Sequence, residues 1–229
     1  MGLKNSKHVY TINGAVIVPV ETIKDLGIYV SNDLSWSAHI NEIVNKANRV
    51  CNVILHAFVC HSVELHMSAF ETYVKPILDY CCFIWNPTLF RDIDKIENVQ
   101  RAFTRRHFAK CGLPRMDYCD RIKILQICSI ERDRFVKCLT MFHKIYHKFV
   151  VCNVLNDFTF PLYLSHLRGH DKRLFVPLVK KSVRKSYFVF RFARVWNSLP
   201  QNVVSSNVSK AFCCRLGLLN LSDLYDFRF

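Results

Sequence analysis

The stretch TYVKPILDYCCFIWNPTLFRDIDKIENVQRAFTRRHF (residues 72–108) decides the fold, because it predicts two helices separated by a short break. The first helix is apolar and ends near Trp85, where Asn86-Pro87 interrupts it. The second, Asp92 to Phe108, is amphipathic when successive residues are placed 100° apart. Its apolar stripe consists of Ile93, Ile96, Val99, Phe103 and His107. Its opposite face carries four cations, Arg91, Lys95, Arg101 and Arg105.

The N-terminal residues predict a small β element. HVYTINGAVIV (residues 8–18) contains two β-prone runs around Asn13-Gly14, a dipeptide typical of tight hairpins. Ile23 to Val30 predicts a third strand. From Asp33 onward the period changes to three and four residues, which predicts a long amphipathic helix capped by Ser35 or Asp33.

Helical patterns continue along most of the remaining chain. Ser62 is a candidate cap for the next helix, and Pro76 predicts a kink or interruption within it. Further helices are expected after Asp117 and over residues 129–149, 187–196 and 208–216. The sequence therefore predicts a mainly α fold with a small N-terminal β element, an α+β arrangement.

The net charge of +14 favours a polyanionic partner, either nucleic acid or an anionic membrane surface. The charge is concentrated, because residues 165–200 hold nine lysines and arginines against Asp171 alone, whereas residues 1–64 are balanced. A local surplus of this kind indicates a binding surface better than a high isoelectric point does. Its densest part is KKSVRKSYFVFRFAR (residues 180–194), in which cations alternate with aromatic residues.

The cysteines favour an intracellular protein, cytoplasmic or nuclear, with reduced thiols. Their number, eleven, is odd, and no signal-like segment opens the chain. We expect no transmembrane segment, because no run approaches ~18 apolar residues. An alternative is a structural or membrane-surface protein with a myristoylated Gly2, since the first six residues fit the M-G-x-x-x-S/T pattern.

The cysteines and histidines do not predict a metal site. Cys111, Cys119, Cys128 and Cys138 are too far apart for the paired ligands of a zinc site. The best remaining cluster is Cys51, Cys60, His61 and His66, for which we expect a structural role. We expect no bound cofactor and no catalytic residue in this chain.

Four blocks of the sequence resemble, in the same order, the region after the polymerase core of reverse transcriptases from non-LTR (LINE, jockey-like) retrotransposons. One block resembles the pattern Y-x-x-x-x-W followed by D-I-x-x-I/L-E-x-V-Q-R. Its matching residues are Tyr80, Trp85, Asp92, Ile93, Ile96, Glu97, Val99, Gln100 and Arg101. The block before it resembles K-x-L-G leading to L-x-W-x-x-H-I, matched by Lys24, Leu26, Gly27, Leu34, Trp36, His39 and Ile40.

The other two blocks follow in the C-terminal half. SIERDR (residues 129–134) is similar to S-L-E-x-R-R. RGH (168–170), VRKSYF (183–188) and WNSLP (196–200) are similar to the family's R-G-H, R-x-x-F-x-x-R and W-N-x-L-P. The resemblance implies a palm remnant at residues 1–34, a helical thumb-like domain at 35–150 and a basic C-terminal extension at 151–229.

In that family the thumb and extension hold template RNA and primer, and the catalytic F/Y-A-D-D box, with its magnesium site, lies upstream of the resembling region. No Asp-Asp pair occurs in these 229 residues, so we expect no polymerase activity from this chain alone. The resemblance predicts a fragment of an RNA-directed DNA polymerase that binds RNA or an RNA–DNA hybrid. The alternative from the charge alone is a free-standing basic helical protein that binds nucleic acid.

The residues expected to contact nucleic acid lie in two segments. Backbone phosphates would be bound without sequence preference by Arg91, Lys95, Arg101, Arg105, Lys180, Lys181, Arg184, Lys185, Arg191 and Arg194. An unpaired base would stack on Tyr187 or Phe188. The plainer alternative is a solvated basic face whose charges pair within the helix, for example Glu97 with Arg101, and aromatic residues that belong to the core.

Overall fold

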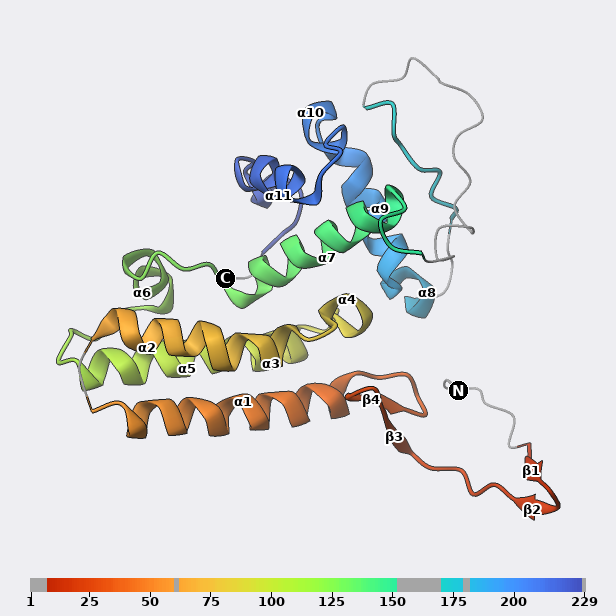
Figure 1. The fold of residues 1–229 in the computed structure, drawn as a ribbon, viewed down its shortest axis with the longest axis horizontal. Helices are drawn as coiled ribbons and strands as arrows, with labels where there is room; N and C mark the ends of the chain where they lie inside the picture. The colour runs from red at the N-terminus through yellow and green to blue at the C-terminus, as the bar shows by residue number, and fades with distance from the viewer. Residues whose placement is uncertain (1–7, 60–61, 152–169, 179–181, 228–229) are drawn as a thin grey trace. The chain divides into compact units, whose positions relative to one another are not determined.

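Helices dominate the structure. The computed structural model describes residues 8–59, 62–151, 170–178 and 182–227. Within these ranges the chain is mostly helical, and its only strands are four short ones near the N-terminus (Figure 1). This confirms the expected mainly α fold with a small N-terminal β element. No helix in the described ranges is long and apolar enough to cross a membrane.

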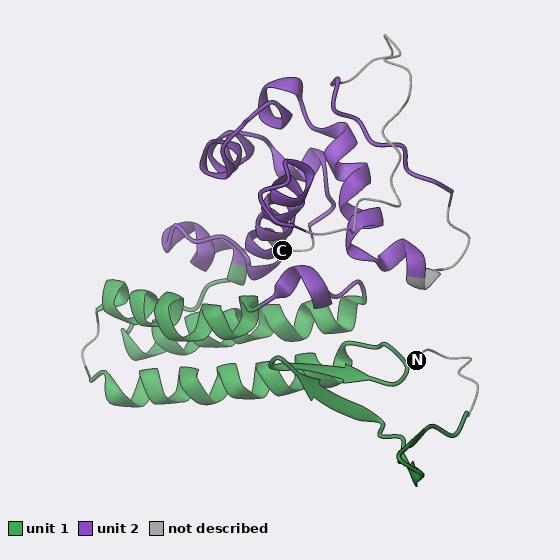
Figure 2. Cartoon of the chain, turned by 45° about the vertical axis from the view of Figure 1, so that its right-hand side comes forward, with its two compact units in different colours: residues 1–80, 89–118 green, residues 81–88, 119–229 purple. Residues whose placement is uncertain are grey.

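The chain folds into two units, and unit 2 includes a short segment from the middle of unit 1's sequence (Figure 2). Unit 1 consists of residues 1–80 and 89–118, and unit 2 of residues 81–88 and 119–229. The boundaries expected from the resemblance, at residues 34 and 150, divide the chain differently. In the structure the N-terminal strands share unit 1 with the first long helices, and residues 119–150 belong to unit 2.

Two separate β-hairpins open unit 1. Strands β1 (Thr11–Ile12) and β2 (Ala15–Val16) pair across Asn13 and Gly14, both of which have positive φ, as predicted. Strands β3 (Thr22–Asp25) and β4 (Ile28–Ser31) form a second hairpin, so the prediction of one strand through Ile23 to Val30 was wrong. The turn at Leu26 and Gly27 has φ values of 44° and 85°. Leucine rarely takes this conformation, so the turn has a weak sequence signal.

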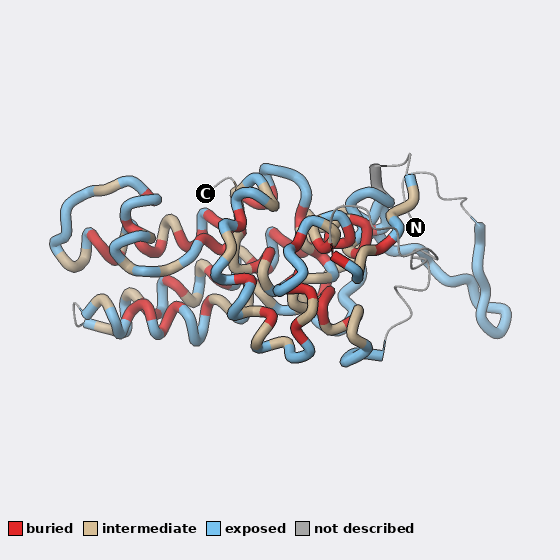
Figure 3. The backbone as a smooth tube through the Cα atoms, turned by 90° about the horizontal axis from the view of Figure 1, so that it is seen from above, coloured by how far each residue is buried: buried red, intermediate tan, exposed pale blue. Residues whose placement is uncertain are grey.

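The first hairpin and strand β3 are exposed to solvent in the described structure. Every residue from 8 to 27 is exposed, and the arm they form is pale blue throughout in Figure 3. Burial begins at Ile28 in β4. Unit 1 therefore obtains its core from its helices.

The core of unit 1 lies between three helical rods that run side by side (Figure 1). They are α1 (Ser37–Ala57), the rod of α2 (Val63–Ala69) with α3 (Lys75–Asp79), and α5 (Phe90–Lys110). All five residues of the predicted apolar stripe on α5 are buried, which confirms its orientation. The buried aliphatic and aromatic side chains that meet here include Ile40, Ile43, Phe70, Leu78, Ile96, Val99 and Phe103.

Helix α1 begins without the predicted side-chain cap. Its first residue is Ser37, and the residue before it, Trp36, supplies no capping hydrogen bond from its side chain. The Asp33 carboxylate instead accepts the Ser35 backbone N–H at 2.9 Å. The prediction of a cap by Ser35 or Asp33 was therefore wrong, because Asp33 stabilises the turn that precedes the helix.

Pro76 interrupts the second rod in the way its chemistry requires. Proline lacks the N–H that would bond to the carbonyl four residues back. The helix accommodates the missing hydrogen bond with a wider, π-helical turn before Pro76. Residues Phe70–Val74 form a π-helix, in which the Lys75 N–H bonds the Phe70 carbonyl. The Ser62 hydroxyl accepts the Leu65 N–H and caps the start of the rod. Both predictions for this rod are confirmed.

The rod ends before the predicted position at Trp85. Helix α3 stops at Asp79, and Cys81 takes the left-handed conformation with φ 50°. This costs an L-residue about 1 kcal/mol and marks a sharp change of direction. The short helix α4 (Cys82–Trp85) that follows belongs to unit 2. The break therefore falls at a cysteine pair, where no glycine or proline signals it.

Unit 2 is built around helix α7 (Ile130–Tyr146), whose N-cap Ser129 accepts the Arg132 N–H. Helix α4, helix α9 (Phe188–Ser198) and helix α11 (Ser209–Gly217) pack against it. The unit's other elements are α6 (Tyr118–Ile124), which begins in unit 1, α8 (Ser182–Ser186), α10 (Gln201–Val204) and the 3₁₀ turn Leu221–Asp223. The core is aromatic, with Phe142, Phe192, Trp196 and Phe212 fully buried.

Unit 1 buries a pair of histidines. The rings of His66 on α2 and His107 on α5 lie 4.9 Å apart, and both side chains are fully buried. His66 Nδ1 lies 2.9 Å from the Ser62 carbonyl oxygen. Burial, together with the smaller effect of the nearby charges of His66 and Lys110, lowers the pKa of His107 to about 4. The histidine pair is therefore packed in a form that resists protonation of His107.

This burial predicts acid sensitivity. The unfolded chain takes up the His107 proton near its ordinary pKa of 6.5, whereas the folded chain does so only near 4. The free energy of unfolding should therefore fall as the pH is lowered from about 6.5 to about 4, by up to roughly 3 kcal/mol. Replacing His107→Leu should remove this part of the pH dependence in urea denaturation followed by circular dichroism. The exposed His56→Ala serves as control, and equal pH dependence in both variants would contradict the prediction.

Candidate nucleic-acid interface

The block that resembles K-x-L-G leading to L-x-W-x-x-H-I is held together by contacts within unit 1. The Tyr80 hydroxyl donates to the Leu26 carbonyl oxygen at 3.1 Å, across the hairpin turn. Gly27, next in that turn, has φ 85°, a conformation that favours glycine. The Tyr29 N–H donates to His39 Nδ1 at 3.3 Å. These contacts attach the β3–β4 hairpin to α1 and to the end of α3.

Three polar residues of the D-I-x-x-I-E-x-V-Q-R block, Glu97, Gln100 and Arg101, contact Tyr118, which the sequence gave no reason to select. The Tyr118 hydroxyl donates to the buried Glu97 carboxylate and accepts from Gln100 Nε2 at 3.0 Å. The Arg101 guanidinium lies 5.4 Å from the Tyr118 ring centre. Burial and the Glu97 charge raise the pKa of Tyr118. Glu97 and Gln100 are therefore structural residues that hold the start of α6.

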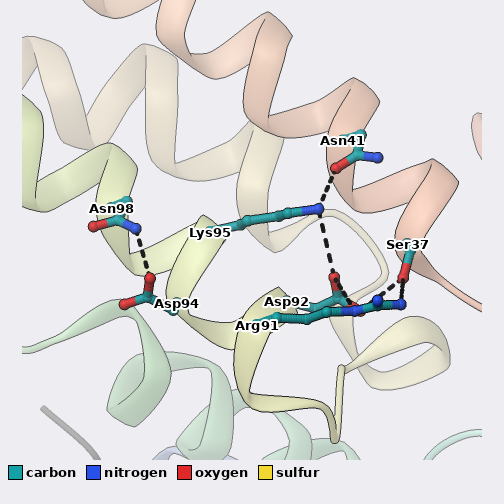
Figure 4. Close-up of polar contacts among 7 residues, drawn as sticks. All are labelled: Ser37, Asn41, Arg91, Asp92, Asp94, Lys95 and Asn98. Atoms are coloured by element: carbon teal, nitrogen blue, oxygen red, sulfur yellow. Dashed lines mark hydrogen bonds and ion pairs between the residues drawn. The ribbon is translucent and has the colours of Figure 1, made fainter.

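Two of the four predicted cations on α5 reach across to α1 (Figure 4). Lys95 Nζ donates to the Asn41 amide oxygen at 2.7 Å and lies 3.8 Å from the buried Asp92 carboxylate. Arg91 donates to the Ser37 hydroxyl at 3.2 Å, and that hydroxyl donates to Asp92 at 2.9 Å. These cations compensate a buried carboxylate and join two helices.

The other two predicted cations lie elsewhere on the helix. Arg101 forms an ion pair with Asp94 at 3.2 Å, on the edge that faces Tyr118. Arg105 is exposed and has no hydrogen bond or ion pair with a described residue. Arg106 and Lys110, which the prediction left out, bond to α1 at Asn52 and at the Leu55 and Phe58 carbonyls. The predicted face of α5 is therefore split into two edges, with Arg105 between them.

The remaining blocks meet inside unit 2, around Asn86. The Arg134 guanidinium is buried and lies 4.0 Å from the Trp85 ring centre. Its Nε and Nη2 groups donate to the Asn86 side-chain oxygen at 3.1 and 2.9 Å. Arg191 of α9 donates to the Asn86 main-chain carbonyl oxygen at 2.8 Å. Segments that are far apart in sequence thus share one polar anchor.

The R-G-H and W-N-x-L-P blocks bind each other as well. His170 Nε2 donates to the Trp196 carbonyl oxygen at 2.8 Å, and the Trp196 indole N–H donates to the Lys172 carbonyl oxygen at 2.9 Å. The Asn197 side chain exchanges two hydrogen bonds with the backbone of Leu174. Burial lowers the pKa of His170, which agrees with a neutral ring in this role. These motif residues fasten residues 170–174 to the end of α9.

Three of the basic residues within residues 180–194 line one pocket in unit 2. Lys180 and Lys181 lie outside the described residues. Lys185, Arg191 and Arg194 line a pocket of about 240 Å³ together with aromatic side chains. Arg184 lies apart, 5.2 Å from the Phe190 ring centre. The predicted stacking residue Tyr187 is exposed at the break between α8 and α9, and Phe188 is half-buried.

A second pocket with basic residues lies in unit 1, although the charge of residues 1–64 is balanced. It measures about 520 Å³ and lies between the β3–β4 hairpin, α1 and α3. Lys24, Lys46 and Arg49 line it, together with Tyr29 and Tyr80. The spacing of Lys46 and Arg49, three residues apart on α1, was the available signal.

The described residues offer no metal site among the candidate cysteine and histidine ligands. Among the described residues no group of three or more histidine, cysteine, aspartate or glutamate side chains can hold a metal ion. Cys60 and His61 of the best sequence cluster lie outside the described residues, as does Gly2. Cys51 is buried, and burial raises the pKa of its thiol to about 12, as expected for a core residue.

The comparisons with known proteins give one distant relative. The chain is 30% identical over 129 residues to the uncharacterized protein B0403.1 of Caenorhabditis elegans. The match covers 56% of this chain and 65% of that relative's length. No protein-family model matches the chain. No solved structure matches it.

The Asn86 anchor predicts a large stability effect. Arg134→Ala removes a buried cation–aromatic contact and two hydrogen bonds, so it should lower the free energy of unfolding by about 2–3 kcal/mol. Lys210→Ala, at an exposed position of helix α11 in the same unit, should change it by less than about 0.5 kcal/mol. Urea denaturation measures both. Similar losses for the two variants would show that the anchor contributes little.

Proposed function

We propose that this chain binds the sugar-phosphate backbone of RNA or of an RNA–DNA hybrid, as part of a non-LTR retrotransposon reverse transcriptase. The proposal assigns it binding without polymerisation and an intracellular location, cytoplasmic or nuclear. The observation that carries it is the grouping of Lys185, Arg191 and Arg194 around one pocket of unit 2. These residues come from α8 and α9 of the segment that the resemblance assigns to the basic extension.

The distribution of charge supports unit 2 as the main binding surface. Unit 2 contains 19 lysines and arginines against 7 aspartates and glutamates, a surplus of 12 out of the total of 14. Unit 1 contains 13 against 11, a surplus of 2. A polyanion is attracted to the unit with uncompensated charge, because each phosphate contact releases a counterion.

The state of the individual cations supports the same choice. Lys185 and Arg194 are exposed and have no hydrogen bond or ion pair with a described residue. They can contact phosphates without giving up an internal partner. Lys95 and Arg101 on α5, in contrast, would have to exchange the partners they already have. On α5 this leaves Arg105 as the readiest phosphate contact.

The resemblance gains a physical basis from the contacts between its blocks. Tyr80 contacts the turn of the K-x-L-G block, and Trp85 contacts Arg134 of the S-L-E-x-R-R block. His170 contacts Trp196 within the last block. These residues support each other structurally, so their joint presence agrees with one inherited framework. The binding residues are then the cations that this framework leaves exposed.

Salt-dependent RNA affinity tests the proposal. Fluorescence anisotropy with labelled RNA–DNA hybrid and single-stranded RNA of mixed sequence should show affinity that falls linearly in log–log coordinates with salt. The double variant Lys185→Ala/Arg194→Ala should weaken binding to all sequences about equally. It should also reduce the slope by roughly 1–2, because two phosphate contacts are lost.

A matched control removes the same charge elsewhere in unit 2. Lys137→Ala/Lys210→Ala changes two exposed lysines on α7 and α11 that do not line the pocket. It should retain most of the affinity and slope. Equal losses in the two double variants, or binding by the wild type that ignores salt, would reject the proposal. Arg101→Ala/Arg105→Ala in the same assay measures the share contributed by α5.

A further inference from the structure

The pocket of unit 2 combines an aromatic interior with a basic rim. Phe190 and Phe192 of α9 and Tyr225 near the C-terminus supply aromatic surface, and Lys185, Arg191 and Arg194 supply charge. Tyr225 joins the pocket from a part of the sequence that carries no basic motif. It remains half-buried, whereas Phe190 and Phe192 are buried. Tyr225 is therefore the aromatic ring with the most surface left to offer a ligand.

The walls of the pocket are fixed by contacts within unit 2. The Tyr225 ring packs against Phe135 of α7 and against Phe227, with ring centres 4.9 Å apart in each case. Arg191 is held by the Asn86 carbonyl and lies 5.7 Å from the Phe192 ring centre. A ligand therefore meets a pre-formed aromatic wall and one positioned guanidinium, and little ordering is needed on binding.

The size of the pocket selects a small planar group. Its volume of about 240 Å³ lies below the ~300–1,000 Å³ that is usual for drug-sized ligands. A single ring system fits such a space, whereas a base pair does not. Aromatic surface next to cations is the arrangement with which proteins bind single-stranded nucleic acid, because bases stack on rings while phosphates meet the charges.

Resting on the proposed function, we propose that this pocket takes one unpaired base of single-stranded RNA, stacked on Tyr225. The flanking phosphates lie against Lys185 and Arg194. Bases within a duplex are paired and stacked on each other, so their faces cannot enter the pocket. The site therefore distinguishes single-stranded from double-stranded regions, which the phosphate contacts of the proposed function do not.

Three probes with equal numbers of phosphates test this inference on the full chain: a single-stranded RNA, a duplex of half that length, and an abasic strand that lacks every base. The base-bearing strand should bind roughly tenfold more tightly than the abasic strand, as expected for one stacked base. Tyr225→Leu should reduce this ratio to about twofold or less. Tyr225→Phe should retain it and shows whether the aromatic ring is the active feature.

The exposed Phe175 of unit 2, which does not line the pocket, provides the matched control, since Phe175→Leu should leave the ratio unchanged. Lys185→Ala should weaken the base-bearing and abasic strands by the same factor. Equal, salt-dependent binding of all three probes would overturn the base pocket and leave the proposed function in place. A preference for vesicles with anionic lipids over single-stranded RNA would also overturn it. Absence of binding to every nucleic acid would instead reject the proposed function itself.

Discussion

The buried guanidinium of Arg134 is the constraint on which unit 2 depends. A charge removed from water needs partners, and Arg134 obtains them from the Trp85 ring and the Asn86 side chain. Both partners lie in the short segment that unit 2 receives from the middle of unit 1's sequence. Because Asn86 also accepts a hydrogen bond from Arg191, the same residue positions one wall of the basic pocket. Stability and the proposed binding site thus share one anchor.

The helices were predictable because burial imposes a repeated pattern over many residues. The stripe of α5, the Ser62 cap of the second rod and the interruption at Pro76 follow from periodicity and backbone chemistry, and the structure confirms them. The failures occur where one residue takes an uncommon conformation. Leu26 closes the second hairpin and Cys81 ends the second rod, both with positive φ. Neither residue type signals such a turn, so the tertiary structure decides these positions.

The candidate site was predictable in composition but only partly in geometry. A helical wheel places Arg91, Lys95, Arg101 and Arg105 on one face, yet it contains no information about neighbouring helices. Arg91 and Lys95 donate hydrogen bonds to Ser37 and Asn41 on α1. Arg101 forms an ion pair with Asp94. The place of Tyr225 in the pocket had no sequence signal, because its position beside α9 depends on the path of the C-terminal residues. The proposed surface therefore rests more on charge density along the sequence than on helix periodicity.

Ultraviolet crosslinking of bound RNA, followed by mass spectrometry of the crosslinked peptides, tests the central claim most directly. It locates RNA on the protein without any substitution. The account predicts crosslinks in peptides from α8 and α9 and in the peptide that contains Tyr225, with weaker crosslinks near Arg105. Crosslinks confined to peptides outside α8, α9 and the C-terminal segment would contradict the claim that unit 2 holds the principal RNA-binding surface.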